Sequence, residues 1–252
     1  MQEQKLETLN VAIDSIRFRF GSQALTKAAE LPPPQPWPSR TPIDPLTGIG
    51  GLPRGRLTLL TGNGTCGKLS LALSLLANAT HEFAHVMVID FSSFDPWSLL
   101  PFFPELSALT VVRAPAPEIA GESAAALAKA GAGFILLLGE IPEHWLGPLE
   151  AGANRSGTVV VGVVDSPGRA FAHASSLSLG LSRTSWICER EQVIGLRTSA
   201  RCVKNRVARP LGETELEIRY PLGTRPLFDH PVHLTKSTLE PVELLECESA
   251  AI

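Results

Sequence analysis

The sequence predicts an α/β domain with a mostly parallel central sheet, antiparallel strands at its C-terminal edge and a separate N-terminal helix. Three observations lead to this fold class. Four short, almost continuously apolar segments alternate with helical segments, a pattern typical of parallel strands buried on both faces. A glycine-rich turn joins the first of these strands to a helix. The chain has 252 residues, 44% of them hydrophobic, which is enough for one large domain.

The central strands are expected at residues 56–61, 85–90, 133–138 and 158–164. A helix follows the first strand as far as Ala77, and an alanine-rich helix covers residues 124–130. Beyond Trp186 apolar and polar residues alternate, which predicts half-exposed antiparallel strands. These strands are expected at residues 192–197, 201–207 and 215–220. Prolines return after Gly223, so residues 225–252 are predicted to form an irregular tail.

The beginning of the chain is predicted to be a helix on a stiff tether. Residues 4–20 form an amphipathic helix that ends at Gly21. Its apolar side chains recur at steps of three and four and form one stripe: Leu6, Leu9, Ile13, Ile16 and Phe20. Residues 31–45 hold seven prolines, which predicts an extended linker between a helix-and-strand segment at 1–30 and a core domain at 46–224. Because an isolated helix is marginal in water, the stripe must pack on its own domain or on a neighbouring molecule.

Composition argues against several classes of protein. Lys and Arg number 22 against 25 Asp and Glu, a net charge of -3, which disfavours coating of nucleic acid by bulk charge. No apolar run approaches the roughly 18 residues of a bilayer span, and the N-terminus lacks a signal-peptide layout. We therefore expect a cytoplasmic protein without a membrane partner. The four cysteines form no C-x-x-C pair, so neither a metal site nor a disulfide framework is expected.

Residues 62–70 lie between a predicted strand and a predicted helix and match most of the phosphate-binding pattern G-x-x-x-x-G-K-[ST]. The loop glycines Gly62, Gly64 and Gly67 and the cation of Lys68 are candidates for cradling phosphates. The position that should offer a hydroxyl to Mg²⁺ is Leu69, and Ser70 points about 100° further round the helix. ATP is therefore a possible ligand, with a relic loop as the alternative, and Mg²⁺ is not expected.

Hydrolysis needs two further groups, a carboxylate that supports the metal and one that orients the attacking water. Gly139 stands at the end of the third central strand, where an aspartate would be expected. Glu140 is shifted by one residue and would face the other side of that strand. Asp90 is the carboxylate at the end of the second strand. These faults predict a protein that is not an enzyme, a pseudo-ATPase without catalytic residues.

The surroundings of the loop resemble those of bacterial RecA recombinases. The matching segments, in order along the chain, are Phe20-Gly21, Ile43-Asp44, residues 50–56, Val88-Ile89-Asp90, Asp95-Pro96, residues 203–210 and residues 215–220. The resemblance covers about residues 4–223. It implies a RecA-like P-loop core, and it implies that the N-terminal helix packs on an adjacent protomer. It also assigns Lys204 and Arg206 to the protomer interface, where they would reach a nucleotide held by the neighbour.

The sequence also departs from the RecA pattern. The family's catalytic glutamate falls at Ser92. The connection between Glu140 and Thr158 is too short for the family's first DNA-binding loop with its helix, and Asp165 is followed almost at once by the next helix. The chain thus resembles a degenerate RecA paralogue of the ImuA type, associated with the SOS response, DNA repair and translesion mutagenesis. The expected partner is RecA or a translesion-polymerase-like protein, and self-association is possible.

Two alternatives from other classes stay open. One is a weak DNA-stimulated ATPase whose carboxylate comes from Glu140 or from a partner chain. The other is a nucleotide-dependent DNA-binding module whose phosphate contacts would be Arg155, Arg169, Arg183 and Arg201. Steep loss of binding with added salt would mark the DNA-binding module. Few aromatic residues accompany these arginines, so stacking on bases is not indicated.

Overall fold

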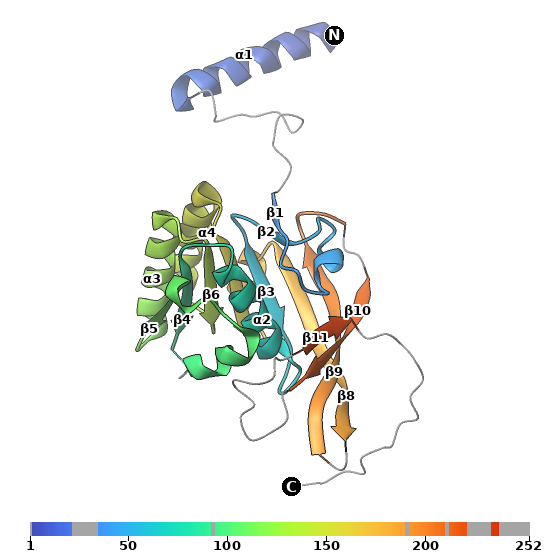
Figure 1. Ribbon diagram of the computed structural model, residues 1–252. Coiled ribbons are helices and arrows are strands. Elements are labelled where there is room, and N and C mark those ends of the chain that lie inside the picture. The colour runs from blue at the N-terminus through green and yellow to red at the C-terminus, as the bar shows by residue number, and fades with distance from the viewer. Residues whose placement is uncertain are drawn as a thin grey trace. The chain divides into compact units, whose positions relative to one another are not determined.

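In the computed structural model, the larger of two compact units is built around a mixed β-sheet (Figure 1). The structure describes residues 2–21, 35–91, 94–189, 192–209, 212–220 and 233–236. The units are residues 1–34 and residues 35–252. None of the helices in these ranges has the length and apolar content that a membrane span requires.

The described strands of this sheet follow the order β11-β10-β9-β8-β3-β7-β6-β4-β5. The parallel strands are β3 (Leu57–Thr61), β4 (Val86–Asp90), β5 (Leu109–Arg113), β6 (Phe134–Leu138) and β7 (Val159–Val164). β8 (Leu177–Glu189) runs parallel to β3 and antiparallel to β9 (Gln192–Asn205). β10 (Glu213–Arg219) and β11 (His233–Lys236) extend the sheet by antiparallel pairing. The predicted α/β class is confirmed.

Helices cover both faces of the parallel strands. Alternate residues of each strand point to opposite faces, and two separate apolar cores result. Helix α2 (Lys68–Thr80) packs into one core with Leu60, Leu136 and Val161. Helices α3 (Pro117–Ala130), α4 (Glu143–Ser156) and α5 (Arg169–Ala174) share the other core with Leu59, Leu137 and Val160 (Figure 1). Burial on both faces is the reason why these strands are almost continuously apolar.

The larger unit begins earlier than the proline count suggested. Strand β1 (Pro36–Trp37) pairs antiparallel with β2 (Leu52–Pro53), and a short 3-10 helix, η3 (Asp44–Thr47), lies between them. The Trp37 side chain is fully buried, its Nε1 donates to Glu82 at 2.9 Å, and its ring meets Phe134 edge-on at 5.3 Å. Residues 35–45 of the expected linker therefore belong to the larger unit, because the tryptophan between the prolines is buried in its core.

Several strands differ from the expected ones. The segments expected at 192–197 and 201–207 are one strand, β9, because Thr198, Ser199 and Ala200 between them are buried and paired. β5 and β8 were not predicted, and β11 lies inside the segment expected to be irregular. β5 is a half-buried edge strand whose pattern is short and weak, and β8 carries irregularities in its pairing with β9 that obscure its alternation.

The smaller unit contains helix α1 (Gln2–Phe20), which confirms the predicted N-terminal helix. Within the predicted stripe, Leu9 and Ile16 are exposed and Ile13 is half-buried, while the Leu6 and Phe20 side chains lie outside the described part. Val11 and Phe18 are also exposed, and at about 100° per residue they lie on the opposite side of the helix. The helix thus carries apolar side chains on two sides rather than on one stripe.

Candidate functional site

The phosphate-loop segment connects β3 to α2, as its sequence predicted, and two of its glycines are required by close contacts. Gly62 has a φ of 152°, and a β-carbon there would lie 2.3 Å from the Leu181 carbonyl oxygen. Gly67 has a φ of 83° at the N-cap of α2, and a β-carbon there would lie 2.5 Å from Ile218. Only glycine accepts both the backbone angle and the crowding. The loop therefore has the strand-to-helix turn that phosphate cradling requires.

The loop is fixed to the sheet by hydrogen bonds to β7, β8 and β9. The Gly62 N–H donates to the Asp165 carbonyl at 3.1 Å, where β7 has just ended. The Thr198 hydroxyl of β9 donates to the Cys66 carbonyl at 2.9 Å. Arg183 of β8 donates to the Thr65 carbonyl at 3.5 Å. The loop conformation is thus preorganised by residues that lie more than a hundred positions away in the sequence.

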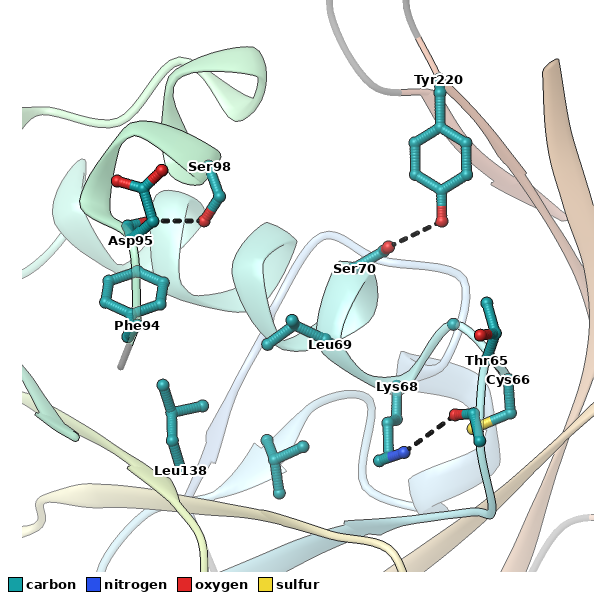
Figure 2. A pocket seen from close by; sticks show the side chains of 13 residues that line it. Thr65, Cys66, Lys68, Leu69, Ser70, Phe94, Asp95, Ser98, Leu138 and Tyr220 are labelled. Atoms are coloured by element: carbon teal, nitrogen blue, oxygen red, sulfur yellow. Dashed lines mark hydrogen bonds between the residues drawn. The ribbon is translucent and has the colours of Figure 1, made fainter. Parts of the chain in front are cut away.

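A cavity of about 610 Å³ opens beside this loop (Figure 2). Apart from loop residues, its wall consists of Phe94, Asp95, Ser98, Leu138, Val163 and Tyr220. Leu69 and Leu138 contribute apolar side chains where the chemistry of a metal-bound phosphate needs oxygen ligands. Asp95 is the one carboxylate in the described wall, and its Oδ1 accepts the Trp97 N–H as a helix cap. No group of three or more described His, Cys, Asp or Glu residues could hold a metal ion.

Two polar side chains at the end of the loop, those of Lys68 and Ser70, have partners inside the protein. The Lys68 ammonium lies 2.7 Å from Oδ1 of Asp165 and donates to the Gly64 carbonyl at 3.1 Å. The Ser70 and Tyr220 hydroxyl oxygens lie 3.2 Å apart. Figure 2 shows the two side chains pointing toward each other. Ser70 therefore meets the residue that follows β10. The sequence did not indicate either partner, since both come from distant strands.

Comparison with known proteins finds relatives that are similar in sequence over most of this chain. No family model matches the chain. It is 30% identical over 263 residues to protein RecA of Chlorobaculum parvum, covering 87% of this chain and 76% of that protein. It is 28% identical over 274 residues to protein RecA of Thermus aquaticus, with 91% and 80% covered. The chain belongs to the RecA family. Protein RecA of Clostridioides difficile is 27% identical over 272 residues, with 91% and 78% covered.

Within this RecA-family site, the end of β6 differs from the sequence-based prediction. Leu138, rather than Gly139, is the β6 residue that lines the cavity. Gly139 has a φ of 136°, and a β-carbon there would lie 2.4 Å from the Phe91 ring. Glu140 does not line the cavity, and its Oε1 accepts the Gly168 N–H at 2.6 Å. The position that lacks an expected carboxylate at the cavity wall is therefore Leu138.

Asp90 ends β4, but its buried carboxylate is engaged in an ion pair with the exposed Arg113. Its Oδ2 lies 2.6 Å from Arg113 of the neighbouring β5 and accepts the Phe94 N–H at 2.7 Å. It does not line the cavity. The Asp90 carboxylate thus stabilises the pairing of β4 with β5 and the turn to Phe94, and it does not face the cavity. Ser92, predicted to stand where RecA carries its catalytic glutamate, lies outside the described residues.

The connection between β6 and β7 is almost entirely helix α4, which leaves no long loop there. After β7, α5 begins at Arg169, so the second connection is equally short. The sequence predicted a connection too short for the first DNA-binding loop of RecA together with its helix, and α4 alone occupies nearly all of it. The absence of a long loop in either described connection agrees with the sequence.

Lys204 and Arg206, which the RecA resemblance assigned to a protomer interface, differ in their surroundings. The Lys204 ammonium donates to the carbonyls of Ala172 and His173 at 2.5 and 2.9 Å, at the C-terminal end of α5. Burial lowers the pKa of Lys204, and the nearby charge of Arg206 lowers it further. Arg206 is exposed. Lys204 therefore caps a helix of its own chain, and Arg206 is the residue of this pair that faces outward.

Replacing Lys204 with methionine is expected to lower the free energy of unfolding by about 1–3 kcal/mol, because the α5 carbonyls lose their donor. Arg206→Met is the matched control, and its effect should stay within about 0.5 kcal/mol. Urea unfolding followed by circular dichroism measures both. Equal effects of the two substitutions would contradict a capping role for Lys204.

Proposed function

We propose that this chain is a non-hydrolysing, RecA-like regulatory or scaffold protein of the DNA-damage response, similar to the ImuA type and acting in translesion mutagenesis. The observation that carries the proposal is the cavity wall beside the phosphate loop. Leu69 and Leu138 line it, and neither has an oxygen that could bind or support a metal ion. Phosphoryl transfer depends on charge stabilisation by a metal and on an oriented nucleophile. A family member without these groups is suited to binding rather than to turnover.

The proposed partner is RecA or a translesion-polymerase-like protein. Two features support docking on such a partner. Helix α1 exposes Leu9 at 58% and Phe18 at 93%, and apolar side chains with this exposure favour burial against another molecule. Arg206, at the end of β9, is exposed and its charge is available. The same resemblance that assigns α1 to contact with an adjacent protomer makes a RecA protomer the first partner to test.

The test is a pull-down of purified RecA with the full chain. The double variant Leu9→Asp/Ile16→Asp places two charges on the predicted stripe and is expected to reduce retention of RecA at least tenfold. The matched control, Asn10→Asp/Ser15→Asp, adds the same charge to the same helix at exposed polar positions. It should retain RecA as the unmodified chain does.

Two results would contradict the proposal. The first is retention of RecA that is equal for the stripe variant and the control, because the stripe would then not be the docking surface. The second is ATP turnover above background in the presence of single-stranded DNA that is abolished by Lys68→Ala. That result would favour the weak ATPase instead.

A further inference from the structure

Lys68 of the phosphate loop and Asp165 after β7 form an ion pair at the point where a phosphate would be cradled. Strands β3 and β7 are parallel neighbours, with Thr61 opposite Val164, so the residues that follow them emerge side by side. The Gly62 N–H donates to the Asp165 carbonyl, which fixes the aspartate backbone against the loop. From there the Asp165 carboxylate reaches the Lys68 ammonium at 2.7 Å.

Among the described residues of the cavity wall, none offers Lys68 a comparable anion. Leu69 and Leu138 are apolar, and the carboxylate of Asp95 caps η4 (Pro96–Phe102) through the Trp97 N–H. The Lys68 side chain is 14% exposed, so its charge is largely withdrawn from water and needs a partner. Asp165 provides that partner from within the chain.

We propose that Asp165 is an internal anion that occupies Lys68 in place of a ligand phosphate, so that nucleotide phosphates bind this loop only when the pair opens. The ligand class is a nucleotide polyphosphate, recognised by the loop amides and the freed ammonium. Opening the ion pair costs free energy, which lowers the apparent affinity for the ligand. The free carboxylate also repels the incoming phosphates. The proposal assigns Asp165 a regulatory role at the candidate nucleotide site.

The surroundings of Asp165 allow the carboxylate to leave the lysine. Its side chain is 68% exposed, whereas that of Lys68 is not. A second cavity of about 660 Å³ also borders the loop and is lined by Asn63, Asp165, Ser166 and Arg183 among others. The Arg183 guanidinium stacks on Trp186 at 4.3 Å and offers a second cation in that cavity. The aspartate can therefore exchange Lys68 for solvent and Arg183 without becoming buried and unpaired.

The experiment compares Asp165→Asn with the unmodified full chain by isothermal titration calorimetry. ATP and inorganic tripolyphosphate are the probes, each with EDTA and with added Mg²⁺. We expect roughly tenfold tighter binding of both probes to Asp165→Asn, the size expected when one partly exposed ion pair and one repulsive charge are removed. Glu122→Gln, an exposed carboxylate on α3, is the control for loss of one negative charge and should leave the affinity unchanged.

The double variant Lys68→Ala/Asp165→Asn shows whether the gain depends on the lysine. Loss of the tenfold gain in this variant supports the proposal. Equal affinity of Asp165→Asn and the unmodified chain, absence of measurable binding to either, or a gain that persists without Lys68 would overturn it. Circular dichroism melting confirms that each variant is folded. The measurement uses the isolated chain, so its failure is distinct from failure of the RecA pull-down.

Discussion

Replacing Trp37 with alanine is expected to lower the free energy of unfolding by about 3–5 kcal/mol, the usual cost of deleting a buried tryptophan. The Trp37 side chain is fully buried and packs on Phe134 of β6. Its Nε1 hydrogen bond to Glu82 joins the proline-rich segment to the end of α2. The substitution would leave a cavity between this segment and the sheet, and chemical denaturation would measure the loss.

Trp97→Ala is the matched control, because Trp97 is 63% exposed and its backbone N–H keeps its bond to Asp95. Its effect should stay within about 0.5 kcal/mol. If Trp37→Ala were equally mild, residues 35–45 would behave as a linker, as the proline count first suggested, and the buried packing described above would be contradicted.

Gly139→Asp is expected to destabilise the protein by about 2–4 kcal/mol without creating ATP turnover. The backbone at Gly139 has a φ of 136°, which an L-residue rarely adopts, and strain of this kind costs about 1–3 kcal/mol. A β-carbon would also lie 2.4 Å from the Phe91 ring, which must move. Thermal unfolding and a phosphate-release assay measure the two effects.

Gly131→Asp separates the backbone strain from the crowding. Gly131 has a φ of 91°, yet a β-carbon there has no neighbour within 4 Å. Its substitution should cost about 1 kcal/mol, close to the penalty for losing a glycine helix cap. If both substitutions lowered the free energy of unfolding equally, the Phe91 ring would have moved away from the new β-carbon without measurable cost. Turnover in Gly139→Asp would mean that this position, and not Leu138, faces the nucleotide cavity.

The elements predicted from local patterns alone were found where the pattern is strong. β3, β4, β6 and β7 are buried on both faces, so continuous apolar runs identified them. The glycine spacing likewise predicted the turn before α2, because positive φ values require glycine there. β5 and β11 were not predicted. They lie at the two ends of the described strand order, where short segments become strands because they pair with a neighbour and not because of a clear apolar periodicity.

Long-range pairings account for the remaining differences. Trp37 was assigned to a linker because prolines surround it, and its burial against Phe134 depends on packing between segments about a hundred residues apart. The capping of α5 by Lys204 likewise depends on where β9 passes that helix, and the place of Lys204 at a protomer interface stays a prediction. Neither contact can be predicted from the local sequence, because hydrogen bonds and packing between distant segments do not depend on the residues that are adjacent in the sequence.

By itself the sequence determined that Lys68 of the loop is followed directly by Leu69, which has no hydroxyl, since side-chain chemistry is a property of residue identity. It also determined the α/β class and carried the similarity that places the chain in the RecA family. Only the tertiary structure decided that Leu138 faces the cavity and that Asp165 meets Lys68. Which side chains face the cavity, and which form ion pairs, depends on the order of the strands and on where parallel strands end. The neighbouring ends of β3 and β7 bring residues 68 and 165 together although 97 positions separate them.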